Sequence, residues 1–210
     1  MKKIYFIRHG ESEGNAGPIR QTAVTSLTEK GRSQAVFVAE RCAKLSIDAI
    51  ISSTMTRAKE TAEMIIKRTS KPVEYSDLFI ERRRPSEVIG KHKDDPIALK
   101  AEKEIRSRFH EQGWRFSDEE NFDDLKERAL AALRHLAERP EENILVVTHG
   151  IFMRVTIACA VFGDKLTGEE CDQFIRAFPM ENTGITLLSY DEKEKSPWRV
   201  WVWNDHAHLG

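Results

Sequence analysis

The chain has 210 residues; its 33 lysine and arginine residues nearly balance its 34 aspartate and glutamate residues, and the formal net charge is -1 at pH 7. This balance argues against a basic nucleic-acid-binding protein and against an acidic, unstructured tail. Hydrophobic residues make up 40% of the chain, which is enough for one domain of ordinary size with a buried core.

The first part of the chain alternates between short apolar runs and longer amphipathic segments. The apolar runs predict buried strands at residues 3–7, 47–51 and 73–75. A glycine-rich loop follows the first strand, and Thr28 then caps a helix whose apolar positions continue at helical spacing to Leu45. A second helix begins near Thr56 and ends before Pro72, because proline cannot continue a helix.

The pattern weakens over residues 77–121. This segment contains a run of three arginines, Arg82–Arg84, and a charged helix that begins at Asp95 and Pro96. It still keeps several apolar residues, at Ile89, Ile97, Ile105, Phe109, Trp114 and Phe116. We therefore interpret 77–121 as a lid or specificity insertion inside a single domain that spans residues 1–210, rather than as a linker.

The last part of the chain continues the alternation. The expected elements are an amphipathic helix, an apolar strand, two further helices and a C-terminal hairpin, over residues 122–139, 143–147, 151–162, 168–178, and 183–190 with 198–203. Strands that alternate with helices predict a three-layer α/β/α sandwich with a mainly parallel central sheet. In such sheets, ligands bind at the carboxyl ends of the strands.

No metal site, disulfide framework or membrane segment is expected. The cysteines are widely spaced, at Cys42, Cys159 and Cys171, and form no Cys-x-x-Cys pair. His206 and His208 have the spacing of a metal-binding pair, but they lie close to the end of the chain, where order is uncommon. The longest apolar runs fall short of the roughly 20 residues that a membrane helix needs. We expect a cytoplasmic protein.

Two of the predicted strands end in the same dipeptide. His9 and His149 each follow a buried strand and each precede a glycine, which lets the backbone approach a ligand closely. The helices that begin after such loops present free N–H groups to an anion. Arg8 and Arg57 add planar guanidinium groups that fit phosphate oxygens. Two histidines with two arginines predict a phosphate site in which an imidazole is the nucleophile.

Four segments, taken together, resemble the histidine phosphatase superfamily in its phosphoglycerate-mutase-like branch. They match the family patterns RHGES-x-x-N, LT-x-x-G-x-x-QA, SS-x-x-x-RA-x-x-TA and the second histidine motif, at residues 8–15, 27–35, 52–62 and 147–150. The matches follow the family's order and span the chain from residue 3 to about residue 190. The resemblance implies the phosphoglycerate-mutase-like fold and a phosphoryl-transfer activity.

The resemblance also implies roles for the residues of these motifs. His9 is expected to become phosphohistidine, Arg8, Arg57 and His149 to form the phosphate pocket, and Asn15 to contact the phosphoryl group. A hydrogen bond from the other ring nitrogen of His9 to a backbone carbonyl would fix the reactive tautomer. Because two guanidinium groups and a histidine supply the positive charge, neither a metal ion nor another cofactor is expected.

The leaving alkoxide needs a proton, and Glu81 falls where the family places its general acid. Glu87 and Asp77 are the alternatives. A carboxyl group that donates a proton at neutral pH needs a raised pKa. The same group would later accept a proton from the attacking water.

Two stretches depart from the mutase pattern. Arg82–Arg84 and Pro85 replace the aromatic-glycine segment of mutases, and residues 19–22 lack the Gly-Trp that often follows the first motif. We therefore favour a phosphatase over a mutase or a catalytically inactive phosphate-binding module, with a small phosphorylated substrate and inorganic phosphate as ligands and no nucleic acid or membrane partner. Gln21, Thr22 and Arg82 are further candidates for substrate contact. The oligomeric state stays open, with a homodimer as one option.

Overall fold

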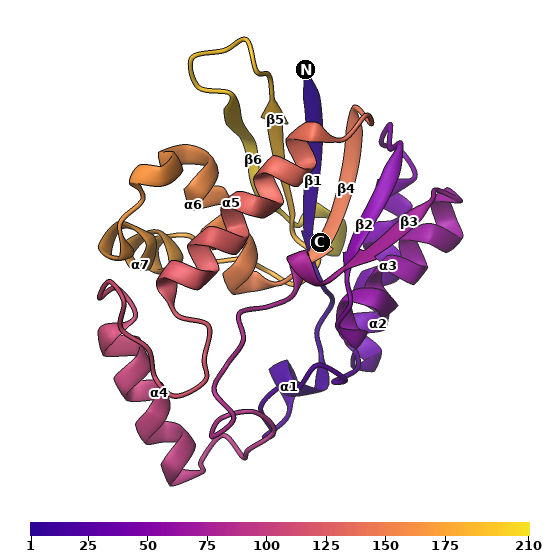
Figure 1. Cartoon of the computed structure of the whole chain (residues 1–210). Coiled ribbons are helices and arrows are strands. Elements are labelled where there is room, and N and C mark those ends of the chain that lie inside the picture. Colours follow the sequence, from indigo (N-terminus) through magenta and orange to yellow (C-terminus); the bar gives the residue numbers. More distant parts are fainter.

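The computed structural model describes all of residues 1–210 and has a central sheet of six strands with helices on both faces (Figure 1). The strands are β1 (Lys2–Arg8), β2 (Ala49–Ser53), β3 (Val73–Ser76), β4 (Asn143–Thr148), β5 (Ile185–Tyr190) and β6 (Trp198–Asp205). Their order in the sheet is β3-β2-β4-β1-β5-β6. The first four are mutually parallel, whereas β5 and β6 form the antiparallel hairpin predicted at the C-terminus. The predicted mainly parallel α/β sheet is confirmed.

Seven helices accompany the sheet. They are α1 (Glu13–Ala16), α2 (Glu29–Cys42), α3 (Thr56–Thr69), α4 (Pro96–Arg108), α5 (Phe122–Glu138), α6 (Gly150–Phe162) and α7 (Gly168–Ala177). Helices α2 and α3 cover one face of the sheet, and α5 and α6 cover the other (Figure 1). None of these helices combines the length and the apolar character needed to cross a lipid bilayer.

The central strands are buried on both faces. In β1, Ile4 and Phe6 pack in the cluster that includes α5 and α6, whereas Tyr5 and Ile7 pack in the cluster that includes α2 and α3. This division follows from the alternation of side chains along a strand. Since both faces need apolar side chains, a parallel strand in this position has the continuous apolar run seen in the sequence.

The capping residues predicted from the sequence take those roles in the structure. The Thr28 side chain accepts a hydrogen bond from the Gly31 N–H at the start of α2. Asp95 accepts two from the first turn of α4, and Pro96 is the first residue of that helix, where its missing N–H costs nothing. The expected helix boundaries therefore agree with the structure to within a few residues.

One element differs from the prediction. The glycine-rich loop after β1 contains the short helix α1, in a region expected to have no regular structure. Ser12 caps this helix, and the side chain of Asn15 bonds back to the Ser12 main chain, which completes a capping box. These reciprocal bonds stabilise a single helical turn that apolar spacing does not reveal.

The segment 77–121 projects away from the sheet, and α4 stands farthest from it (Figure 1). It is fastened to the loop after β1, where Ile19 forms an isolated bridge with His92. The guanidinium of Arg20 holds Glu102 of α4 at 2.8 Å. The segment therefore lies beside the loop that carries the first predicted motif.

Candidate active site

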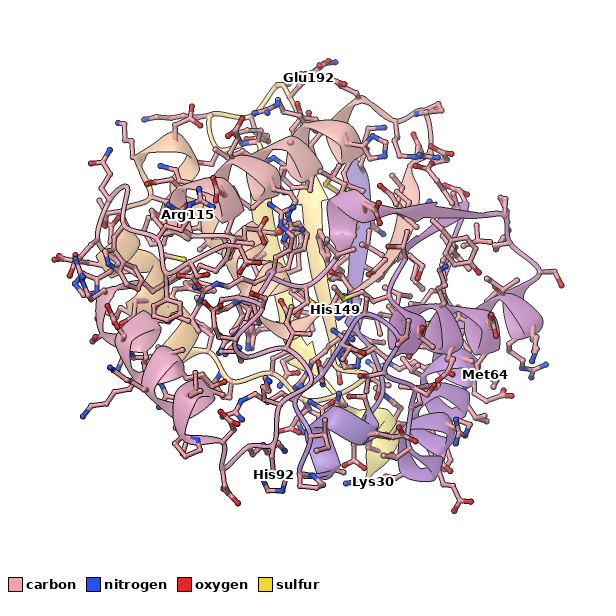
Figure 2. The ribbon with its side chains drawn as sticks, turned by 60° about the horizontal axis from the view of Figure 1, so that its bottom comes forward. Lys30, Met64, His92, Arg115, His149 and Glu192 are labelled. Atoms are coloured by element: carbon pink, nitrogen blue, oxygen red, sulfur yellow. The ribbon has the colours of Figure 1, made fainter.

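The two histidines meet at one edge of the sheet. Strands β1 and β4 are parallel neighbours, with Arg8 in register with Thr148, so His9 and His149 leave the sheet side by side. Their ring centroids are 5.0 Å apart, and both side chains are buried. Figure 2 brings this edge forward and shows His149 near the middle of the molecule. The expectation that the two His-Gly strand ends adjoin is confirmed.

Hydrogen bonds hold both ring nitrogens of His9. Nδ1 lies 2.7 Å from the carbonyl oxygen of Gly10, so it donates and carries the ring proton. Nε2 then accepts a hydrogen bond from Nε of Arg57, at 3.2 Å. The predicted bond to a backbone carbonyl is present, and it leaves Nε2 with the lone pair that a nucleophile requires.

Burial and neighbouring cations keep both imidazoles neutral. The pKa of His9 lies well below its ordinary value, because burial disfavours the charged form and because Arg57 and Arg8 repel a third positive charge. The pKa of His149 is lowered for the same reasons. Burial also lowers the pKa of Arg57, to about 10, which leaves its guanidinium charged at neutral pH. Fixed guanidinium charges beside neutral imidazoles suit a dianionic ligand.

Stability is expected to fall as the pH drops below about 6.5, the ordinary pKa of histidine. Folded His9 and His149 remain neutral in this range, because their pKa values are lowered, whereas their unfolded counterparts bind protons. Each histidine then contributes a slope of up to about 1.4 kcal/mol per pH unit. Urea unfolding between about pH 7 and 5 measures this slope. In His9→Gln, the slope of the unfolding free energy against pH should be shallower by up to the contribution of one histidine. An unchanged slope would contradict a neutral His9.

The second histidine is held by a hydroxyl group. Nε2 of His149 lies 2.8 Å from Oγ of Ser53, at the end of β2. Nδ1 of His149 and Nε of Arg8 are buried and have no hydrogen-bond partner. Buried polar groups usually have hydrogen-bond partners. An oxygen of a bound anion would accept a hydrogen bond from Nε of Arg8.

Glu81 lies at the N-terminus of α6, the helix that begins after His149. Its carboxylate accepts hydrogen bonds from the N–H groups of Ile151 and Phe152, at 3.2 and 2.9 Å. Its charge acts on both arginines, since it partly offsets the effect of burial, which lowers the pKa of Arg8 and Arg57. The structure therefore brings Glu81 to the histidines and arginines.

The two alternative acids lie elsewhere. Asp77 bonds to the hydroxyl of Thr54, and Glu87 accepts a hydrogen bond from its neighbour Ser86 at 3.3 Å. Neither carboxylate bonds to α6. Of the three candidates, Glu81 is therefore the one that bonds to the helix that begins after His149.

The remaining loop candidates have different placements. Asn15 and Gln21 line a cavity of about 250 Å³ together with Glu81. Thr22 offers its carbonyl oxygen to Nη1 of Arg57 at 3.0 Å, so its contribution is to hold a guanidinium. Asn15 and Gln21 thus border the space next to Glu81, and Thr22 supports the pocket through its main chain.

Arg82 is buried in an ion pair. Its Nη2 lies 2.5 Å from Glu119, a fully buried carboxylate, and its guanidinium stacks 4.0 Å from the ring centroid of Phe109. It also borders the cavity that contains Glu81. The charge of Arg82 is therefore already compensated, which distinguishes it from Arg8 and Arg57.

Comparison with known proteins decides the family. A family model of the histidine phosphatase superfamily, branch 1, matches residues 4–206. A protein of Salmonella arizonae, named as a probable phosphoglycerate mutase GpmB, is 31% identical over 100% of this chain and 95% of its own length. The chain belongs to the histidine phosphatase superfamily.

Several solved structures share the fold of this chain over nearly its whole length. Bacillus stearothermophilus YhfR is 27% identical, with a TM-score of 0.82, and 100% of each chain is covered. The mycobacterial glucosyl-3-phosphoglycerate phosphatase is 26% identical, with a TM-score of 0.79 over 97% of this chain and 99% of its own. A phosphoserine phosphatase of Entamoeba histolytica, solved with phosphoserine, is 25% identical, with a TM-score of 0.79 over 100% of each chain.

Several motif residues hold the loop after β1, a role that sequence reasoning did not assign. Gly10 N–H donates to the hydroxyl of Thr61, and Glu11 N–H donates to the side chain of Gln34. The Thr28 N–H donates to the carbonyl oxygen of Glu11. The second and third motifs therefore fix the main chain of Gly10 and Glu11, directly after His9.

Gly31 allows α2 to contact this loop. A Cβ atom at position 31 would lie 1.9 Å from the carbonyl oxygen of Glu11. Gly31→Ala should therefore lower the free energy of unfolding by about 3 kcal/mol, at the upper end of overpacking costs. Urea unfolding measures the change. Ser33→Ala, at an exposed position of the same helix, should stay within about 0.5 kcal/mol of the parent, and equal stability of the two variants would contradict the close contact.

A buried ion pair, also missed by the sequence reasoning, fixes the main chain around Glu81. The Arg128 guanidinium on α5 donates to the carbonyl oxygens of Leu78 and Ile80, at 3.0 and 2.9 Å. The same group pairs with buried Glu120, at 2.6 Å. Glu120 in turn accepts a hydrogen bond from the Arg83 N–H. The segment that carries Glu81 is thus tied to the start of α5 from two sides.

Proposed function

We propose that this chain hydrolyses phosphate monoesters through a phosphohistidine intermediate on His9. The observation that carries the proposal is the state of that ring. Nδ1 is bound to the Gly10 carbonyl, while Nε2 keeps its lone pair beside the Arg57 guanidinium. A neutral imidazole with a directed lone pair, next to fixed positive charge, can attack a phosphate ester without a metal ion.

The first step transfers the phosphoryl group to the protein. Nε2 of His9 forms a bond to phosphorus while the bond between phosphorus and the ester oxygen breaks. Glu81, in its protonated form, gives a proton to the departing alkoxide. Arg8 and Arg57 face the charge that spreads over the equatorial oxygens in the transition state.

The second step regenerates the histidine. Water attacks phosphorus, the bond between phosphorus and Nε2 breaks, and inorganic phosphate leaves. The Glu81 carboxylate takes the proton that the water loses, which restores the starting state of both groups. The same carboxyl group therefore acts as acid and then as base.

The similar proteins support a phosphatase, and one group supports an alternative. The solved structures at 25 to 26% identity are named as phosphatases of glucosyl-3-phosphoglycerate and phosphoserine. The Salmonella relative at 31% identity is named as a probable phosphoglycerate mutase. Transfer between two positions of a phosphoglycerate is therefore the second candidate reaction.

Turnover of p-nitrophenyl phosphate between about pH 5 and 8, with a chelator present, tests the proposal. Hydrolysis with an acid-labile phosphoryl group on His9 is expected, because the charges that replace a metal are side chains. Formation of 2-phosphoglycerate from 3-phosphoglycerate, faster than phosphate release, would favour the mutase. Absence of both turnover and labelling would leave a phosphate-binding module.

A further inference from the structure

Two cavities adjoin near Glu81, and neither is lined by His9 or His149. The first, of about 250 Å³, is lined by Asn15, Gln21 and Glu81 among others. The second, of about 320 Å³, lies between α4 on one side and α6 and α7 on the other. The two share four lining residues, Arg82, Arg84, Glu102 and Ile151. On the left side of Figure 1, α4 lies below α7. Residues of both helices line the second cavity, which we name the tail pocket.

The tail pocket has apolar walls on two opposite sides. Ile105 and Phe109 contribute from α4 and its C-terminal end, and Ile151 and Ile175 contribute from α6 and α7. Its volume lies in the range of pockets that hold small ligands. The phosphoryl group itself needs no apolar wall, so this space fits the part of a substrate that carries the ester oxygen.

Positive charge exceeds negative charge along the two cavities. The lining contains six cationic side chains, Arg20, Arg82, Arg84, Lys93, Arg106 and Arg176, and three carboxylates, Glu81, Glu102 and Asp172. Several of these cations already form ion pairs. Glu102 pairs with both Arg20 and Arg84, at 2.8 and 2.9 Å, and Asp172 pairs with Arg176 at 2.8 Å.

Arg106 is the cation of the tail pocket that no carboxylate compensates. Its neighbours in the lining, Arg82, Arg84 and Arg176, each have an acidic partner. Arg106 forms no ion pair, and it follows directly after Ile105 of the apolar wall. A guanidinium group binds a carboxylate through two parallel hydrogen bonds. The pocket therefore offers an apolar surface with one free cation beside it.

We propose that the tail pocket binds the leaving group of the natural substrate, and that this group has an apolar stretch ending in a carboxylate that pairs with Arg106. The proposal rests on the proposed phosphatase function, because it places the reacting ester oxygen next to Glu81. The substrate class is thus a phosphate monoester of a hydroxy acid whose acidic and phosphoryl groups are separated by an apolar chain.

A series of ω-carboxyalkyl phosphates of increasing chain length, with their uncharged methyl esters, tests the substrate class. We expect kcat/KM to rise roughly threefold per methylene until the pocket is filled, as apolar area is buried. At the best length, the carboxylate should exceed its methyl ester by about fivefold, the range of a partly exposed ion pair. No advantage of the carboxylate at any length would overturn the proposal.

Arg106→Gln locates the effect. The ratio of kcat/KM for the carboxylate substrate over its methyl ester should fall to about one in this variant. Both substrates are measured on one preparation, so the fraction of folded protein does not affect the ratio. Lys103→Gln is the matched control, since it removes one exposed cation of α4 that lines neither cavity. A ratio that survives Arg106→Gln, or falls equally in Lys103→Gln, would overturn the assignment. Turnover of p-nitrophenyl phosphate without any carboxylate preference would leave the phosphatase function standing and reject the tail pocket alone.

Discussion

Replacing His9 with asparagine should lower kcat for p-nitrophenyl phosphate by about 10⁴-fold or more, because the proposed covalent intermediate forms on this ring. Nε2 of His9, which accepts a hydrogen bond from Arg57, is the ring nitrogen with the lone pair. The neighbouring His149 is held differently, since its Nε2 lies 2.8 Å from the hydroxyl of Ser53. Steady-state turnover measures kcat, and acid-labile phosphoryl labelling measures whether the covalent intermediate forms.

His206→Asn is the matched control for this experiment. This histidine is exposed near the C-terminus and bonds only to a nearby main-chain carbonyl, that of Asn204. It should keep both turnover and labelling. Labelling that persisted in His9→Asn would move the nucleophile to another residue, with His149 as the first to examine.

Replacing Glu81 with glutamine should slow alkyl phosphates by about 10²- to 10⁴-fold, the usual contribution of a general acid. Aryl phosphates such as p-nitrophenyl phosphate should lose about tenfold or less, since their leaving groups need little protonation. Glutamine keeps the size of the side chain and one acceptor oxygen, whereas Glu81 offers one oxygen to the N–H of Ile151 and the other to the N–H of Phe152. The two substrates, measured side by side for kcat, separate proton donation from structural damage.

Equal losses on alkyl and aryl phosphates would remove Glu81 from the role of acid. Glu87→Gln and Asp77→Asn, the other two candidates, serve as controls. Asp77 bonds to Thr54, and Glu87 bonds to Ser86, so neither should change the ratio of alkyl to aryl turnover. A selective loss on alkyl phosphates in one of them would transfer the assignment to that residue.

The sequence predicted the pairing of the two histidines because the physical reason is local. Each follows a continuous apolar strand, and parallel strands place their carboxyl ends at one edge of a sheet. The register of Arg8 with Thr148 then brings the two rings together. The same logic predicted the sheet, since strands and helices alternate along most of the chain.

Other parts of the site depend on partners that are distant in sequence. Ser53 contacts His149 across 96 positions, and Arg82 meets Glu119 across 37. Neither a single serine nor a run of arginines forms a periodic pattern, so the sequence does not indicate these contacts. The capping box that forms α1 is likewise a side-chain effect within one turn, and apolar spacing does not report it.

The bond between Arg57 and His9 has a consequence for the chemical reactivity of the proposed nucleophile. The lone pair on Nε2, which attacks phosphorus in the proposed reaction, accepts a hydrogen bond from the Arg57 guanidinium. Phosphate oxygens compete for the same guanidinium and so release the nitrogen that is to react with them. In the proposed reaction, the nucleophile is therefore protected from other electrophiles by Arg57, and the negative charge of the substrate makes it available.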